Sequence, residues 1–149
     1  MHTDSILLIQ DNPDDVVLTC LALEKNNIKN EVIVKRDGIE ALNDLLEDQP
    51  DSNRKNRFPK LILIDLNSPK IDGYEITNQL KSNIQTRLIP IVILTTSSET
   101  RDILNAYKSG ANSYIQKTVN FDEFVQVIKH IANYWLQLNV FSLTYGSRS

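Results

Sequence analysis

The residues of this chain that are best suited to chemistry each follow a short predicted strand. They are Asp11 after residues 6–9, Asp65 after residues 61–64, Thr95 after residues 91–94 and Lys117 after residues 114–116. In an open α/β sheet, ligands bind at the carboxyl ends of the strands, where such side chains lie. Carboxylates bind hard cations, while a hydroxyl and an ammonium group donate hydrogen bonds to phosphate oxygens. Converging on one cleft, these four side chains would form a site for a metal ion and a phosphoryl group.

Each of these residues also has an ordinary structural interpretation when it is taken alone. Asp65 could be a turn residue or a helix cap, and Lys117 could be a solvated surface charge. The segment 95–98 is rich in hydroxyls, and we expect Ser97 or Ser98 to cap the following helix. The occurrence of all four side chains at strand ends favours the chemical interpretation.

Composition and charge limit the class of protein. The chain has 149 residues, 41% of them hydrophobic, which is enough for one domain with a single packed core. Its net charge of −3 argues against a dedicated nucleic-acid binder, which would usually be basic. Cys20 is the only cysteine, so no intramolecular disulfide can form, and we expect a small buried hydrophobe there. No run approaches membrane-spanning length and residues 1–5 show no signal pattern, so we expect a cytoplasmic protein without a membrane segment.

Short apolar runs alternate with amphipathic segments along the chain, which predicts β-α units around a parallel sheet. The predicted strands cover residues 5–10, 31–35, 60–65, 90–94 and 113–116. The first helix begins at Asn12 and Pro13, a typical capping pair. Its apolar residues, which we expect to be buried, are Val17, Leu18, Cys20 and Leu21. The predicted fold class is α/β, with a single doubly wound five-stranded parallel sheet.

The last predicted helix, residues 121–135, has the most regular pattern of apolar residues. Phe124, Ile128, Ile131 and Trp135 fill its buried face. The apolar residues left over are Tyr134, Leu136, Leu138, Val140, Phe141 and Leu143. Because an exposed apolar patch usually marks an interface, we expect a homodimer through this helix and a C-terminal extension, residues 137–149. The alternative is that the extension folds back over the core of its own chain.

Four longer motifs carry a resemblance to a known family. They are residues 7–15 (LLIQDNPDD), 63–73 (LIDLNSPKIDG), 90–98 (PIVILTTSS) and 110–117 (GANSYIQK). In this order, each across a strand end, they resemble response-regulator receiver domains along nearly the whole chain. The resemblance implies a single receiver domain over residues 1–149 with the flavodoxin-like (βα)5 fold. The chain looks most like the single-domain regulators paired with bacterial phytochrome kinases, on the strength of residues 65–67, the basic segment 54–57 and the ending 134–136.

The resemblance implies a function and a metal site. Receivers accept a phosphoryl group from a histidine kinase, and Asp65 matches the aspartate that is phosphorylated. Asp11 and Asp65 match ligands of Mg²⁺, to which Asn67 adds a backbone carbonyl. The residues themselves agree with this, because Mg²⁺ prefers few protein carboxylates together with waters and phosphate oxygens.

The resemblance also implies how the signal is read. Thr95 matches the hydroxyl that binds the phosphoryl group, and Lys117 matches the lysine that pairs with it. Tyr114 matches the aromatic residue that turns inward on activation, although an edge aromatic is an equally good interpretation. Since no residues remain for a DNA-binding output domain, we expect signalling through protein–protein contacts and no enzymatic output.

Two positions depart from the family pattern. Gln10 stands where most receivers have a second acidic residue, so we expect weaker Mg²⁺ binding. Thr118 stands where a proline commonly follows the lysine and usually makes a cis peptide. A cis bond costs far more before a residue other than proline, so we expect a trans Lys117–Thr118 bond, which puts the reach of Lys117 in doubt.

Three other functions compete with a phosphoacceptor receiver. A degenerate receiver would bind partners without phosphorylation, which the substitution at Gln10 favours and the presence of Asp65, Thr95 and Lys117 opposes. A phosphatase of the haloacid dehalogenase type would need a second acid two residues after the nucleophile, where Asn67 stands. A flavodoxin-like cofactor binder would need a phosphate-binding loop after the first strand, which the sequence lacks.

Overall fold

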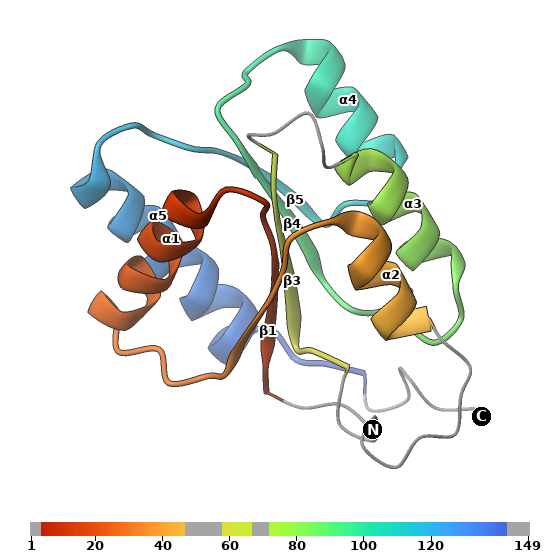
Figure 1. Cartoon of the computed structure of the whole chain (residues 1–149), viewed down its shortest axis with the longest axis horizontal. Helices are drawn as coiled ribbons and strands as arrows, with labels where there is room; N and C mark the ends of the chain where they lie inside the picture. The colour runs from red at the N-terminus through yellow and green to blue at the C-terminus, as the bar shows by residue number, and fades with distance from the viewer. Residues whose placement is uncertain (1–3, 47–57, 67–71, 143–149) are drawn as a thin grey trace.

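The computed structural model describes residues 4–46, 58–66 and 72–142 of the chain (Figure 1). Five parallel strands form one sheet in the order β2-β1-β3-β4-β5. The strands are β1 (Ile6–Ile9), β2 (Val32–Lys35), β3 (Leu61–Asp65), β4 (Ile91–Thr95) and β5 (Ser113–Gln116). The predicted five-stranded parallel sheet is confirmed. No strand end differs from the predicted one by more than one residue.

Helices cover both faces of the sheet. They are α1 (Pro13–Lys25), α2 (Gly38–Leu46), α3 (Gly73–Ser82), α4 (Thr100–Lys108), α5 (Phe121–Ala132) and the π-helix η2 (Asn133–Leu138). In Figure 1, α1 and α5 lie against one face, and α2, α3 and α4 lie against the other. Every residue of the three inner strands, β1, β3 and β4, is therefore buried, which explains their unbroken apolar runs. Among the described residues, no helix is both long enough and apolar enough to span a membrane.

The register of the inner strands aligns their carboxyl ends. Ile9 of β1 pairs with Ile64 of β3, and Asp65 of β3 pairs with Leu94 of β4. Thr95 in turn pairs with Gln116 of β5. Because parallel pairing fixes these neighbours, the residues that follow each strand emerge at one edge of the sheet.

The predicted buried face of α1 is wrong. Its buried residues are Thr19, Ala22 and Leu23, whereas Val17, Leu18 and Leu21 are 56%, 42% and 41% exposed and Cys20 is half-buried. Small Ala22 lets α1 approach its neighbour α5, and the Thr19 hydroxyl is satisfied by donating to the Asp15 carbonyl oxygen at 3.0 Å. A buried polar group with a partner costs little, so packing at close approach outweighs the apolar pattern.

The C-terminal segment also differs in part from the expectation. Phe124, Ile128 and Ile131 are buried as predicted, but Leu136 is buried too, and Phe141 packs against the core on the α2–α4 side. Lys60, just before β3, donates to the Leu136 carbonyl oxygen at 3.0 Å, and its ammonium lies 5.1 Å from the centre of the Phe141 ring. Leu136 and Phe141 therefore do fold back onto their own chain. Tyr134, Leu138 and Val140 remain exposed.

Lys81 at the end of α3 binds the segment before β4, at the end of the sheet opposite the carboxyl ends of the strands. Its ammonium donates to the carbonyl oxygens of Arg87 and Ile89 at 3.1 and 2.8 Å. Its side chain also lies against Gly110, whose φ of +106° is a conformation that favours glycine. Burial lowers the pKa of Lys81 to about 8, despite the two carbonyl acceptors that favour its charged form.

The lowered pKa of Lys81 predicts a dependence of stability on pH. Between about 8 and the usual lysine value of about 10.4, the unfolded state binds more protons than the folded state. The free energy of unfolding contributed by this group therefore rises with pH across that range. We expect the stability of the natural chain, relative to Lys81→Met, to increase over the same range in urea unfolding. A constant difference between the two proteins would contradict this, and the exposed Lys108→Met is the control.

Candidate functional site

The centre of the site is an ion pair between the ends of β3 and β5. The Lys117 ammonium lies 2.9 Å from each carboxylate oxygen of Asp65. Their side chains are 9% and 0% exposed, so the pair is buried. The Lys117 backbone is fixed by its own N–H, which donates to the Thr95 carbonyl oxygen at 2.6 Å. The site therefore holds a carboxylate whose charge is balanced by one cation.

Opposing influences act on the pKa of Asp65. Burial raises this pKa, because a carboxylate loses its hydration in the interior, and burial is the largest effect. The bonds and charge of Lys117 oppose it, while the negative charge of Asp15 adds to the rise. The net direction is upward, which makes Asp65 a more basic carboxylate than an exposed one.

The turn between β1 and α1 places Gln10 and Asp11 beside this pair. Asn12 caps α1 by accepting hydrogen bonds from the N–H groups of Asp14 and Asp15, with Pro13 next to it, as predicted. Gln10 is fully buried, and its Oε1 accepts from the Asn12 N–H at 2.9 Å. Its Nε2 makes no hydrogen bond of good geometry among the described residues, but the amide acts on Asp65 as a donor and lowers the pKa of that carboxyl. Gln10 therefore contributes a buried donor to the side of the site next to Asp65.

The residues that could hold a metal ion are few. Within residues 4–46, 58–66 and 72–142, no three His, Cys, Asp or Glu side chains form a cluster that could hold a metal. Asp11 and Asp65 supply carboxylates at the ends of adjacent strands β1 and β3, and Asn67 lies outside the described residues. Two carboxylates without a full protein cage suit Mg²⁺ or Mn²⁺, which keep several waters and take ligands from phosphate, better than they suit Zn²⁺.

A chain of hydrogen bonds leads from Thr95 to Tyr114. The Thr95 side chain is buried, and its oxygen accepts from the Ser97 N–H at 3.2 Å. The Ser97 carbonyl oxygen accepts from the Tyr114 hydroxyl at 2.8 Å. The expectation that Ser97 or Ser98 caps α4 is wrong, because Glu99 is the capping residue and makes no side-chain cap bond. Ser97 instead orders the loop by accepting from the Glu99 N–H and donating to Asp102.

The substitution at Thr118 does not prevent Lys117 from reaching the site. The described residues contain no cis peptide bond, as predicted for Lys117–Thr118. The Lys117 side chain nevertheless contacts both oxygens of Asp65. A trans bond at this position is therefore compatible with the ion pair.

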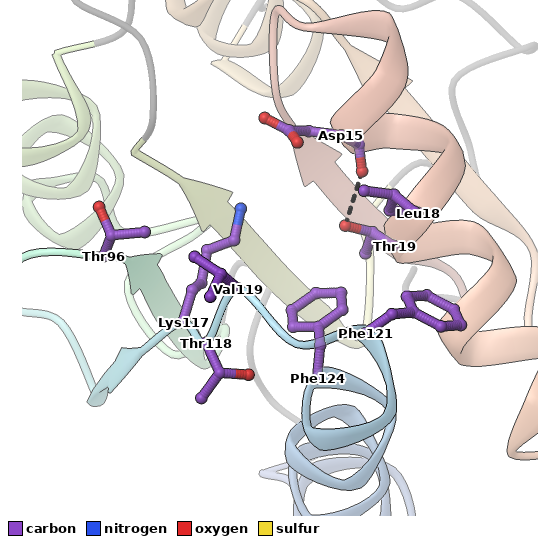
Figure 2. A pocket seen from close by; sticks show the side chains of 9 residues that line it. All are labelled: Asp15, Leu18, Thr19, Thr96, Lys117, Thr118, Val119, Phe121 and Phe124. Carbon is purple, nitrogen blue, oxygen red and sulfur yellow. Dashed lines mark hydrogen bonds between the residues drawn. The ribbon is translucent and has the colours of Figure 1, made fainter.

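One residue of the site was not identified from the sequence. Asp15 lines a cavity of about 210 Å³ beside Lys117, between α1 and the segment that joins β5 to α5 (Figure 2). The sequence indicated only an acid in the first turn of a helix. The sequence offered no further signal, because the cavity forms only where α1 meets the segment after β5 and the start of α5.

Comparison with known proteins places the chain in a family. The chain belongs to the response regulator receiver domain family, which it matches over residues 6–129. Such domains are signalling components of two-component systems, and the resemblance drawn from the four motifs is confirmed.

Relatives linked to phytochromes are among the similar proteins. The response regulator Rcp1 of Synechocystis sp. is 36% identical over 132 residues, which is 89% of this chain and 88% of Rcp1. The phosphorylated cyanobacterial phytochrome response regulator RcpA is 36% identical with a TM-score of 0.81, over 93% of this chain and 97% of RcpA. The bacteriophytochrome response regulator RtBRR is 39% identical with a TM-score of 0.71, over 95% and 86% of the two chains. The predicted similarity to phytochrome-associated regulators is therefore confirmed.

Removing the charge of Lys117 is expected to destabilise the protein through Asp65. Lys117→Met leaves a buried carboxylate without its cation, which costs about 3 kcal/mol in typical buried pairs. Adding Asp65→Asn to that variant removes the unpaired charge and should recover most of the loss. Urea unfolding of the single and double variants measures this coupling. Lys129→Met, at an exposed position, is the control, and equal losses in the single and double variants would refute the account.

Proposed function

We propose that this protein accepts a phosphoryl group on Asp65 from the phosphohistidine of a sensor histidine kinase. The observation that carries the proposal is the buried Asp65 carboxylate held by Lys117 at the carboxyl end of β3, with Thr95 at the end of the next strand. One carboxylate oxygen attacks phosphorus, the bond from phosphorus to the imidazole nitrogen breaks, and an acyl phosphate forms. Lys117 then pairs with phosphoryl oxygens, and the Thr95 hydroxyl donates to one of them.

We further propose that Mg²⁺ is the cofactor. Asp11 and Asp65 would hold it through their carboxylates and Asn67 through its backbone carbonyl. The ion would neutralise charge that develops on the phosphoryl oxygens. Support comes from the donor set and from Rcp1, whose Mn²⁺-bound form is 33% identical to this chain with a TM-score of 0.80, over 94% of this chain and 99% of that one.

The proposed output is a change of surface near α4. In the described state Thr95 accepts from the Ser97 N–H, and Ser97 accepts from Tyr114. A phosphoryl group gives the Thr95 hydroxyl a new acceptor and draws it toward Asp65. The Ser97 loop then shifts, the Tyr114 hydroxyl loses its acceptor, and the ring turns inward. This is a two-state bias from one new set of contacts.

The proposed partners follow from the same relatives. A phytochrome is our candidate for the kinase, and the site would act in the cytoplasm through protein–protein contacts, with neither nucleic acid nor membrane as a partner. The whole chain would act as one receiver domain with residues 137–149 as its C-terminal extension.

A receiver that works without phosphorylation is the second candidate. Buried Gln10 favours it, but the intact Asp65–Lys117 pair supports the phosphoacceptor more strongly.

We also propose a homodimer through α5, η2 and the extension. Leu136 and Phe141 are committed to their own chain, which reduces the apolar surface available. Leu138 and Val140 are still 63% and 91% exposed, and Tyr134 is half exposed beside Trp135. These exposed apolar residues are the surface that a second copy of the chain would cover in the proposed dimer.

Asp65→Asn is expected to abolish phosphorylation, because an amide cannot form the acyl phosphate. Intact mass after incubation with acetyl phosphate and Mg²⁺ measures the transfer, and peptide mapping locates it. The exposed Asp122→Asn should be phosphorylated like the natural chain. Unchanged phosphorylation of Asp65→Asn would assign the site to another residue.

Gln10→Glu is expected to tighten Mg²⁺ binding several-fold, because it adds a negative charge beside Asp11 and Asp65. Calorimetric titration measures the affinity. The same variant should be less stable than the natural chain without the ion and recover when Mg²⁺ is added, since the new charge is buried. Gln79→Glu makes the same charge change at an exposed position of α3, and an equal effect there would argue against Gln10 lining the metal site.

Leu138→Asp is expected to convert the dimer to a monomer without affecting phosphorylation. A charge in an apolar interface cannot be solvated there, so association weakens. Light scattering over a range of concentrations measures the mass. Ile84→Asp is the matched control, because Ile84 is 64% exposed and lies before β4. A natural chain that stays monomeric at high concentration would exclude the dimer.

A further inference from the structure

The cavity beside Lys117 has one apolar wall and one acidic corner. Leu18 from α1 and Phe121 and Phe124 from α5 form the apolar side, and the Lys117 ammonium lies 5.8 Å from the centre of the Phe124 ring. Asp15 forms the acidic corner. Figure 2 shows it extending from α1 toward the same opening as the Lys117 ammonium.

Asp15 is held at this opening by the local structure of α1. Its backbone N–H donates to the Asn12 side chain, and its carbonyl oxygen accepts from buried Thr19. Its charge acts on Asp65, whose proton affinity it raises. A group that occupies this cavity meets Asp15 on one side and, on the other, Lys117, whose ammonium is paired with the buried Asp65 carboxylate.

The cavity fits the leaving group of one class of phosphoryl donor. When the phosphoryl group passes from a phosphorylated imidazole to Asp65, the phosphorus–nitrogen bond breaks and its electron pair returns to the ring. If the other ring nitrogen carries a proton, neutral imidazole departs. If it does not, the much less stable imidazolate must depart. A carboxylate that accepts a hydrogen bond from that N–H keeps the ring protonated, and the proton stays on the departing imidazole.

We propose that Asp15 is the residue that selects an imidazole-based phosphoryl donor, by accepting a hydrogen bond from the ring N–H while Leu18, Phe121 and Phe124 contact the ring. The inference rests on the proposed function and specifies the donor class of the same site. Both donors carry an anionic phosphoryl group, but acetyl phosphate has no N–H to offer and releases a carboxylate, which the charge of Asp15 repels, whereas a protonated imidazole ring carries a positive charge. Asp15 therefore favours the imidazole donor over the carboxylic one.

Phosphorylation rates with two small donors test this selection. We expect Asp15→Asn to slow transfer from monophosphoimidazole about tenfold, the factor that one charge-assisted hydrogen bond supplies. Transfer from acetyl phosphate should be unchanged or faster. The ratio of the two rates is the readout, because it does not depend on the fraction of folded protein. As the pH rises, the ring of monophosphoimidazole loses its proton and the transfer rate falls. This fall should begin at a lower pH in the variant than in the natural chain, because the ring is no longer kept protonated by Asp15.

Asp14→Asn is the matched control. Asp14 is adjacent and exposed, it carries the same charge, and it is not among the residues that line the cavity. The control should leave the ratio of rates unchanged. An equal effect of Asp15→Asn on both donors, or no effect on either, would overturn the selection while leaving the phosphoacceptor function intact. Failure of the natural chain to accept a phosphoryl group from either donor with Mg²⁺ would overturn both proposals.

Discussion

The ion pair between Asp65 and Lys117 is the interaction on which the arrangement of this site depends. It joins the ends of two strands that lie on either side of β4, so it forms only when the order and register of β3, β4 and β5 are correct. Burial makes an unbalanced carboxylate costly, and Lys117 offsets that cost without removing the proposed nucleophile. The same burial that threatens stability keeps the carboxylate basic, so the structural and chemical roles of the pair have one origin.

Three sets of contacts surround the pair. Gln10 and Asp11 on the β1 side offer a buried donor and a carboxylate to whatever approaches Asp65. On the β4 side, Thr95 and Ser97 connect the pair to Tyr114 through backbone and hydroxyl groups. Asp15 and the apolar residues of α1 and α5 form the third side. Under the proposed function, the binding of an ion, the transmission of a signal and the approach of a donor would thus fall on different elements.

Much of this arrangement could be predicted from the sequence, because parallel strands buried on both faces leave an unmistakable apolar run and a polar residue where each run ends. The strand set and the proximity of Asp65 to Lys117 follow from that pattern, and Asn12 as a cap follows from the proline after it. The buried face of α1 could not be predicted from that pattern. Thr19 and Ala22 pack there because α5 approaches closely, and the apolar pattern of α1 alone does not indicate the position of α5. Asp15 and the placement of Phe141 depend on contacts between distant segments, such as the bond of Lys60 to Leu136, 76 residues away.

The hydrogen bond from Lys60 to Leu136 determines where the C-terminal segment is attached relative to the ion pair. Lys60 precedes the first residue of β3 and Asp65 is its last, so the C-terminal segment is fastened at the pole of the sheet opposite the ion pair. The length of a fully buried strand separates the two, and no described bond links Lys60 to the Thr95–Tyr114 chain. The proposed dimer surface at one pole and the proposed phosphoryl transfer at the other would then respond to separate variables, protein concentration for the first and donor supply for the second.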